Sequence, residues 1–346
     1  MPDVPLDPDR SPADELAERR AVAERFARFA RDEAPGRSDV YADWARAIVG
    51  DAAALAVLAR IPARRRQPPL VFAVARMLGA YPGLDGEGLA RWVIEHADRL
   101  VAEASTRLLQ TNDPARCALL LPALALIEGP IALIELGASA GLCLYPDRYA
   151  YRYETPAGAA TTWGSGAPLL TCDQRGKAPL PALRGPQIVW RAGLDLQPLD
   201  AREPQDRAFL RGLVWPGEAG RDERIAAALD VVAGDPPMLR AGDIGRVDAS
   251  GHGDLEALAR DAPAGATLVV TAPGVTPHLP WPVRQALPGR IASLGARFLA
   301  IEPPPRPDGA PAHGPFRVEL DGRVLGFCDP LGEWLEWLPG EGPVAA

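Results

Sequence analysis

The stretch IALIELGASAGLCLYPDRY, from Ile131 to Tyr149, decides the fold, because a short apolar run leads directly into a turn of small residues. The run Ile131 to Leu136 has the length and composition of a buried strand. Every residue from Gly137 to Gly141 is small, so the backbone of this turn can approach a ligand closely. A strand that ends in such a turn and continues into a helix is typical of nucleotide-type cofactor sites in α/β folds.

The same letters contain a second motif, G-x-S-x-G, which presents the nucleophile of α/β-hydrolases. Ser139 would be that nucleophile, and Asp195 or Asp243 and then His278 follow it in the required chain order. However, the chain before Ile131 has helical patterns only, and no oxyanion loop of the H-G-G type precedes the motif. A serine hydrolase is therefore the alternative hypothesis rather than the first.

Composition and charge exclude several classes of protein. The 346 residues are 47% hydrophobic and 24% charged, as in an ordinary globular protein, and the net charge of -8 repels phosphate backbones. The basic cluster Arg64 to Arg66 is expected to be a solvated turn. No run approaches the roughly 18 apolar residues of a membrane span, and the acidic, proline-rich start is unlike a signal peptide. We expect a cytoplasmic protein without nucleic-acid or membrane partners.

Cysteine and histidine are too scattered for a metal site or a disulfide framework. These residues are Cys117, Cys143, Cys172, Cys328, His96, His252, His278 and His313. We expect buried free thiols and no bound metal. No heptad or internal repeat indicates an oligomeric state.

Two regions follow from the periodicity. Residues 1–128 have helical patterns and predict a helical N-terminal region, whereas residues 129–346 alternate short apolar runs with helical patterns and predict an α/β domain. The expected parallel strands are Ile131–Leu136, Gln187–Arg191, Met238–Ala241, Thr267–Thr271 and Arg297–Ile301. The expected crossover helices lie near 207–233, 255–260 and 281–294.

The α/β region has two further features. FRVELDGRVLGF alternates around Asp321-Gly322, which predicts an antiparallel hairpin at the end of a mostly parallel sheet. The segment 149–185 is longer than an ordinary connection and contains strand-like pieces. It is either a lid or substrate wall beside a binding crevice or a surface β-hairpin without a role.

Three motifs resemble the successive cofactor motifs of Rossmann-like S-adenosylmethionine-dependent methyltransferases. They are ELGASAG (135–141), GLDLQPLD (193–200) and AGD (241–243), and the likeness extends from Ile131 to Trp337. Nearly the whole chain also resembles one bacterial family known only as a domain of unknown function, through RQPPLVFAVARML, TNDPARCALLLPALALI and ELGASAGLCLYPDRYAYRY.

The methyltransferase resemblance implies roles for particular residues around S-adenosylmethionine. Asp195 would bind the ribose, Asp243 would bind the adenine and Thr271 would end a strand beside the cofactor. The residues implied around the methionine part are Glu135, Gly137, Ser139 and Gly141. Ser139 departs from the family's glycine, and the segment 149–185 lengthens the path to Asp195.

Candidate groups for the acceptor side lie in three loops. His278, in APGVTPHLP after the fourth expected strand, is the best candidate for a general base. Asp147 and Arg148 follow the first loop, and the candidates for substrate binding are Asn112, Arg116 and Trp163. The sequence thus predicts a methyltransferase for an unknown small molecule; a serine hydrolase and a non-catalytic ligand-binding or scaffold protein are the alternatives.

Overall fold

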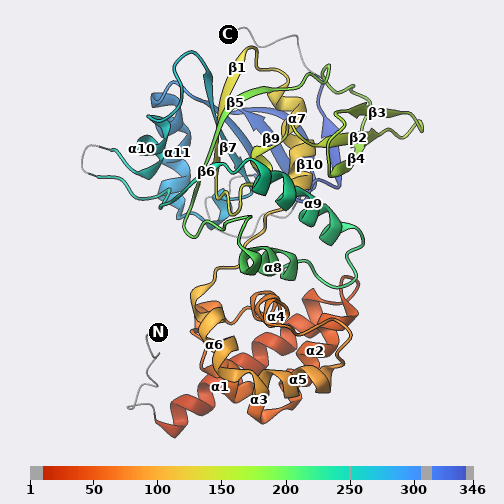
Figure 1. Ribbon diagram of the computed structural model, residues 1–346, viewed down its shortest axis with the longest axis vertical. Coiled ribbons are helices and arrows are strands. Elements are labelled where there is room, and N and C mark those ends of the chain that lie inside the picture. The colour runs from red at the N-terminus through yellow and green to blue at the C-terminus, as the bar shows by residue number, and fades with distance from the viewer. Residues whose placement is uncertain (1–10, 249–250, 305–313, 340–346) are drawn as a thin grey trace. The chain divides into compact units, whose positions relative to one another are not determined.

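The computed structural model describes residues 11–248, 251–304 and 314–339. The chain divides into two compact units (Figure 1). Unit 1 comprises residues 1–111 and 202–223, and unit 2 comprises residues 112–201 and 224–346. A segment from the middle of the sequence therefore belongs to the helical unit.

Unit 1 is built from helices. These are α1 (Pro12–Arg28), the π-helical turn η1 (Phe29–Glu33), α2 (Asp39–Gly50), α3 (Ala52–Ala59), the 3-10 turn η2 (Ala63–Arg65), α4 (Pro68–Met77), α5 (Gly86–Glu95), α6 (Ala97–Thr106) and α8 (Pro204–Gly212). Side-chain caps explain several starts: Ser11 accepts the Asp14 N–H at α1, and Asp51 accepts from Ala53 and Ala54 at α3. The helices α5 and α6 are separate, because His96 leaves the helical conformation between them.

An interlocking aromatic cluster forms the core of unit 1. Phe26, Tyr41, Trp44 and Phe72 are fully buried, and the rings of Tyr41 and Phe72 lie 4.9 Å apart. Trp215, from the segment 202–223, packs at 5.2 Å against Phe29. This contact holds the later segment on the N-terminal helices.

The basic cluster at 64–66 is solvated, as expected, only at the exposed Arg64. Arg66 is buried, donates to the carbonyls of Ile61 and Ala59, and pairs with Glu18. Arg65 donates to the Arg107 carbonyl at 2.9 Å. These guanidinium groups satisfy carbonyls near helix ends, so the cluster is structural.

Unit 2 contains one mixed sheet. In the described residues its eleven strands are β1 (Pro130–Leu136), β2 (Ala150–Glu154), β3 (Ala160–Trp163), β4 (Leu169–Arg175), β5 (Gln187–Asp195), β6 (Met238–Ala241), β7 (Thr267–Pro273), β8 (Arg297–Glu302), β9 (Phe316–Leu320), β10 (Arg323–Cys328) and β11 (Trp334–Trp337). Their order is β3-β2-β4-β11-β10-β9-β8-β7-β1-β5-β6. Most neighbouring pairs are parallel, as expected from the sequence.

The order of the strands reverses at β1. On one side of β1 the chain adds β5 and then β6, and on the other side it adds β7 and then β8. In register, Glu135 lies between Gly193 on β5 and Thr271 on β7. In open α/β sheets, ligands bind outside the carboxyl ends of the strands at such a reversal. The carboxyl end of β1 is therefore the candidate position for a ligand-binding site.

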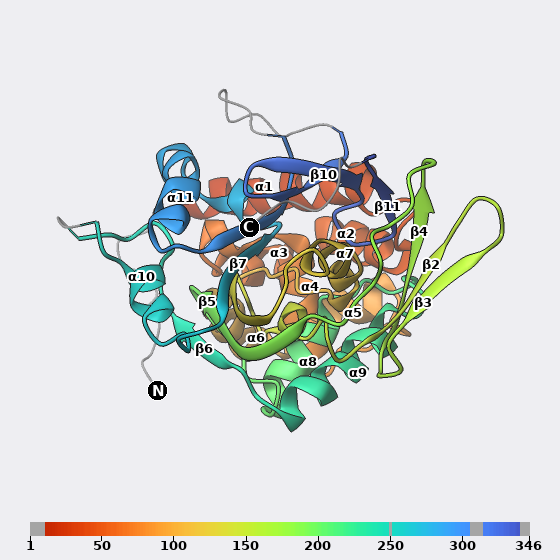
Figure 2. The same cartoon turned by 90° about the horizontal axis from the view of Figure 1, so that it is seen from above.

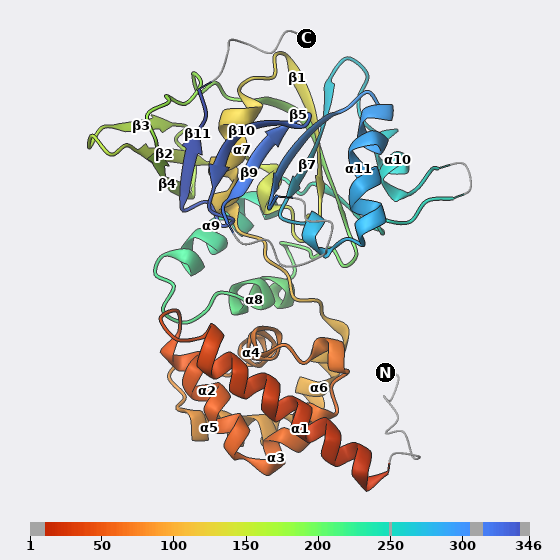
Figure 3. The ribbon, with the colours of Figure 1, turned by 180° about the vertical axis from the view of Figure 1, so that it is seen from behind.

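Helices cover the parallel part of the sheet. They are α7 (Cys117–Leu124), α9 (Arg221–Gly234), which contains the boundary between the units, α10 (Asp254–Ala259) and α11 (Trp281–Ser293), with the 3-10 turns η3 (Pro114–Arg116), η4 (Leu142–Leu144) and η5 (Thr276–His278). Figures 1 and 3 show α10 and α11 side by side on the sheet. Leu255, Leu287 and Ile291 from these helices pack with Ile134 and Val270 in one buried cluster. The eight residues of α7 are all buried, and α7 contacts β4, β8 and β9.

The end of the sheet and the helix after the turn at 137–141 differ from what the sequence predicts. The hairpin β9–β10 forms around Asp321-Gly322 as expected, but it does not end the sheet, because β11 pairs antiparallel with β10 and parallel with β4. The segment 149–185 thereby extends the sheet through β4, β2 and β3, and Figure 2 shows the β2–β3 hairpin projecting at its edge. The helix expected after the turn at 137–141 is only the three-residue η4, since Tyr145-Pro146 follows at once.

None of the helices in the described ranges has both the length and the apolar character needed to cross a bilayer.

Candidate functional site

The turn after β1 is held in an uncommon backbone conformation. Gly137, Ser139 and Gly141 have φ of 71°, 53° and 79°. The Gly137 N–H donates to the Leu194 carbonyl at 2.8 Å, and the Ser139 N–H donates to Asp195 Oδ2 at 2.8 Å. A Cβ on Gly137 would lie 2.7 Å from Val275 Cγ2, so glycine is needed there for packing as well as for φ. The turn is thus pinned to the end of β5.

Substitutions of Ser139 should show this strain in the free energy of unfolding. Ser139→Gly should stabilise the fold or leave it unchanged, whereas Ser139→Val should destabilise it by about 1–3 kcal/mol, because a β-branched residue disfavours positive φ. Urea unfolding of both variants and of Ser139→Ala measures this. A valine variant as stable as the wild type would show that the turn adopts another conformation.

Glu135 ends β1 as a buried carboxyl without full hydrogen bonding. Glu135 is 2% exposed, and its Oε2 atom has no hydrogen-bond partner. Burial raises the pKa of Glu135 well above its usual range; the neighbouring Cys143 and Asp195 add to this rise, and the positive charge of Arg116 opposes it. A group of this kind is costly for the fold and is most easily explained by a ligand.

Asn112 lies beside the same turn. Its Nδ2 donates to the Ala138 carbonyl at 2.6 Å, while its Oδ1 is buried without a partner. The turn that follows is capped by Asp113, whose side chain accepts the Ala115 N–H. Asn112 is therefore free of the capping role and leaves an acceptor oxygen near the turn.

Glu302 ends β8 and is a third buried group with an open acceptor. Its Oε1 accepts the Thr276 N–H at 2.9 Å, and its Oε2 has no partner. Burial raises the pKa of Glu302 to about 7, against the opposing effects of the Thr276 hydrogen bonds, Arg284 and Arg116. Sequence reasoning missed this residue. The only signal was a carboxylate directly after the expected strand Arg297–Ile301, a position comparable to those of Asp195 and Asp243 after their expected strands.

Arg116 connects the ends of these strands. Its Nη1 donates to the Pro273 carbonyl at the end of β7 at 2.7 Å, and its Nε donates to the Pro330 carbonyl at 2.9 Å. Its positive charge lowers the pKa of both Glu135 and Glu302. The residue is 9% exposed, so its charge acts in a poorly solvated region.

The described residues contain five buried side-chain atoms without a hydrogen-bond partner, and three of these are Asn112 Oδ1, Glu135 Oε2 and Glu302 Oε2. Glu135 lies near the end of β1, where the strand order reverses, Glu302 is the last residue of β8, two strands away, and Asn112 contacts the turn that follows β1. All three atoms are acceptors. The edge of the sheet therefore suits a ligand that donates hydrogen bonds or carries positive charge.

A family model described as "Uncharacterized protein conserved in bacteria (DUF2332)" matches residues 23–337. The chain belongs to this family. The match includes the whole described sheet and the helices of unit 1 apart from the first part of α1, so it spans both units. No curated protein and no solved structure matches the chain. Function in this family member has to be argued from the site itself.

Several candidate residues have other roles in this DUF2332 chain. The Thr271 hydroxyl donates to the Ile134 carbonyl at 3.2 Å inside the sheet. Asp243 is exposed, and its Oδ1 accepts the Gly245 N–H at 2.8 Å in its own turn. His278 is exposed at the end of η5. His313 lies outside the described residues.

Asp147 and Arg148 serve mainly as ion-pair partners. Asp147 makes a bidentate pair with Arg191 on β5, at 2.8 and 2.9 Å. Arg148 is exposed and lies 3.4 Å from both Asp147 and Asp235. Arg191 also donates to the Leu144 carbonyl, so the bidentate pair fastens the segment after the turn to β5. Neither residue has a contact that indicates catalysis.

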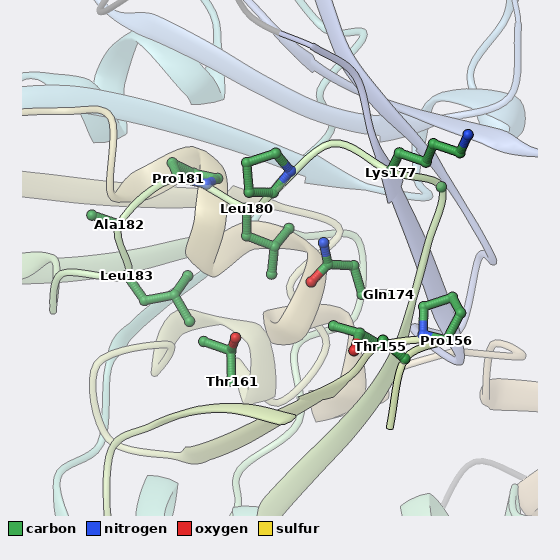
Figure 4. Close-up of a pocket in the computed structure, with 12 residues that line it drawn as sticks. Thr155, Pro156, Thr161, Gln174, Lys177, Leu180, Pro181, Ala182 and Leu183 are labelled. Carbon is green, nitrogen blue, oxygen red and sulfur yellow. The ribbon is translucent and has the colours of Figure 1, made fainter. Parts of the chain in front are cut away.

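Trp163 lies in the added part of the sheet, on the outermost strand β3, opposite Tyr151. A cavity of about 510 Å³ in this region is lined by the loop after β2 and by the proline-rich segment 178–183. Figure 4 shows Leu180 and Gln174 facing one another there, whereas Lys177 extends away. In the sheet this region is separated from β1 by β9, β8 and β7 among others, so Trp163 does not belong to the strand-end site.

The cysteines are free thiols, as expected: Cys117, Cys143, Cys172 and Cys328 are all buried and form no disulfide. Among the residues that the structure describes, no three His, Cys, Asp or Glu side chains come together as metal ligands.

Proposed function

We propose that this protein is an S-adenosylmethionine-dependent methyltransferase that acts on a small molecule in the cytoplasm. The observation that carries the proposal is the buried, unpartnered carboxyl of Glu135 at the point where the strand order reverses. A ligand with a sulfonium and an ammonium group would compensate this carboxyl, and the adjoining turn lets backbone come close to the ligand.

The residues present fit most of the cofactor. Glu135 and Asn112 offer open acceptors for the ammonium group of its methionine part. Asp195 accepts N–H groups from Ser139 and Gln197, one at each oxygen, and each carboxylate oxygen has a second lone pair for a ribose hydroxyl. The residues present do not fit the adenine, because Asp243 is exposed. In addition, η4 is too short to present a helix N-terminus to the cofactor.

When bound, S-adenosylmethionine would supply an electrophilic methyl group. The chain itself then has to bind the cofactor and the acceptor, orient them and exclude water from them. Glu135 would orient the cationic end, and Asp195 would fix the sugar while it also fixes the turn. Four of the residues around this edge are less than 10% exposed, which limits the access of water: Asn112, Arg116, Glu135 and Glu302.

Calorimetric titration with S-adenosylmethionine and with its demethylated product tests the proposal. We expect binding to the wild type and at least tenfold weaker binding to Glu135→Gln and Asp195→Asn, since each loses a charge-assisted contact. Glu154→Gln, an exposed carboxyl on β2, is the control and should bind like the wild type. No heat with the wild type, and no difference with Asp195→Asn, would favour a non-catalytic ligand-binding or scaffold protein.

One observation favours the serine hydrolase as a second candidate. Ser139 has positive φ at the end of a central strand, as the nucleophile of a G-x-S-x-G turn does. The α-helix that follows such a nucleophile is replaced by η4, and Ser139 is 3% exposed. Ser139→Ala separates the two candidates, because it should abolish hydrolysis of a short-chain ester and leave cofactor binding within a fewfold of the wild type.

A further inference from the structure

Glu302 differs from a buried glutamate that serves the fold alone. Glu256 is equally buried, but Arg290 donates to both of its oxygens at 2.8 Å, and the Gly253 N–H donates to Oε2. These contacts lower the pKa of Glu256, although burial by itself would raise it. Glu302 receives hydrogen bonds from Thr276 alone, with the Thr276 N–H on Oε1 and no partner at Oε2. One carboxylate oxygen is thus anchored, and the other remains open.

The cations around Glu302 are engaged elsewhere. Arg116 and Arg284 donate to carbonyls of Pro273 and Pro303. Arg317, which lies opposite Glu302 on β9, pairs instead with Glu319 at 2.6 Å. The positive charges of Arg116 and Arg284 partly offset the desolvation of Glu302. The carboxyl therefore changes its protonation near neutral pH without belonging to an ion pair.

We infer that Glu302 is the catalytic residue of the acceptor side and that the acceptor is an amine, which binds through its ammonium group at the open Oε2. The ammonium N–H donates to the carboxylate, and a proton then passes from nitrogen to Oε2. This leaves a neutral amine with a free lone pair and a neutral carboxylic acid. The inference rests on the proposed methyltransferase function, and it assigns to Glu302 the role that the sequence assigned to His278.

A buried open acceptor suits an ammonium group for two reasons. The cation removes the penalty of desolvating the carboxylate, and its several N–H donors satisfy an oxygen that water does not reach. A base with a pKa of about 7 is also matched to proton transfer at neutral pH. Its place at the end of β8, two strands from β1, separates it from the residues proposed for the cofactor.

Carbon-13 NMR of the full chain, labelled at the glutamate carboxyl carbons, tests this inference without the cofactor or the natural acceptor. The Glu302 resonance is assigned by its loss in Glu302→Gln, and the Glu256 resonance by its loss in Glu256→Gln. We expect the pKa of Glu302 to lie near 7. Methylammonium chloride, compared with sodium chloride at equal ionic strength, should lower it by about one unit, because a bound cation favours the carboxylate.

Glu256 is the internal control and should not respond to methylammonium, since both of its oxygens are paired. A Glu302 pKa in the ordinary range, no response to methylammonium, or an equal response of Glu256 would each overturn the inference. The inference would also be overturned if the pKa of Glu302 changed only in the variant Arg317→Gln, which removes the neighbouring cation. Failure of the methyltransferase proposal is detected separately, by the absence of heat with S-adenosylmethionine.

Discussion

Glu135→Gln is expected to make the protein more stable at neutral pH while it removes cofactor binding. Glu135 has a raised pKa in the folded state, so between about pH 4 and that pKa the folded state holds a proton that the unfolded state has lost. Under that condition the stability of the wild type falls as pH rises. Glutamine carries no titrating group and escapes this loss. We therefore expect the free energy of unfolding at pH 7 to be higher for Glu135→Gln than for the wild type.

Urea unfolding at a series of pH values measures this gain. The difference between the wild type and Glu135→Gln should disappear near pH 4, where the carboxyl is protonated in both states. Glu154→Gln, on the exposed side of β2, is the matched control for the removal of a carboxylate. If Glu135→Gln is less stable than the wild type at pH 7, the carboxyl contributes to the fold and is not reserved for a ligand.

Asp113→Asn is expected to lower the free energy of unfolding, whereas Glu135→Gln is expected to raise it. Asp113 is fully buried, caps η3 through the Ala115 N–H, and pairs with Arg224 of α9 at 3.2 and 3.3 Å. Asparagine can keep the cap, but it leaves the Arg224 charge without its counter-ion. Breaking a buried pair from one side costs about 3–5 kcal/mol, and the partial exposure of Arg224 favours the lower end.

Thermal and urea unfolding measure this loss, with an exposed pair as the control. Asp261 pairs with Arg240 at 2.8 Å, and both side chains are more than a third exposed. Asp261→Asn should therefore cost less than about 1 kcal/mol. The double variant Asp113→Asn with Arg224→Met should recover part of the loss. Equal losses for Asp113→Asn and Asp261→Asn would contradict a specific role for the buried pair.

The parallel strands could be predicted because each is short, apolar and bounded by turn residues. The prediction for Met238–Ala241 was correct at both ends, and β7 and β8 were each found from their apolar runs. The strands β3 and β11 could not be predicted in this way. Residues 160–163 are mostly exposed, and β11 has four residues, so their pairing depends on neighbours far away in the sequence.

The candidate site was predicted only in part, because a sequence shows residue types but not which polar atoms lack a partner. Glu135 could be singled out as a candidate, because it belongs to the motif ELGASAG that resembles a cofactor motif. Asp147 had a suitable residue type and position, but Arg191 lies 44 positions away in the chain and occupies both of its oxygens. Glu302 is distinguished from Glu256 only by the absence of such a partner.

The pairing of β11 with β4 determines when the sheet can be finished during synthesis on the ribosome. The strands β2, β3 and β4 leave the ribosome early, yet the edge of β4 that faces away from β2 stays uncovered until residues 334–337 are available. Parallel pairing across so long a loop forms late. Until then β4 is an open edge that can pair with other chains, so the nascent protein should require a chaperone more than the finished one does.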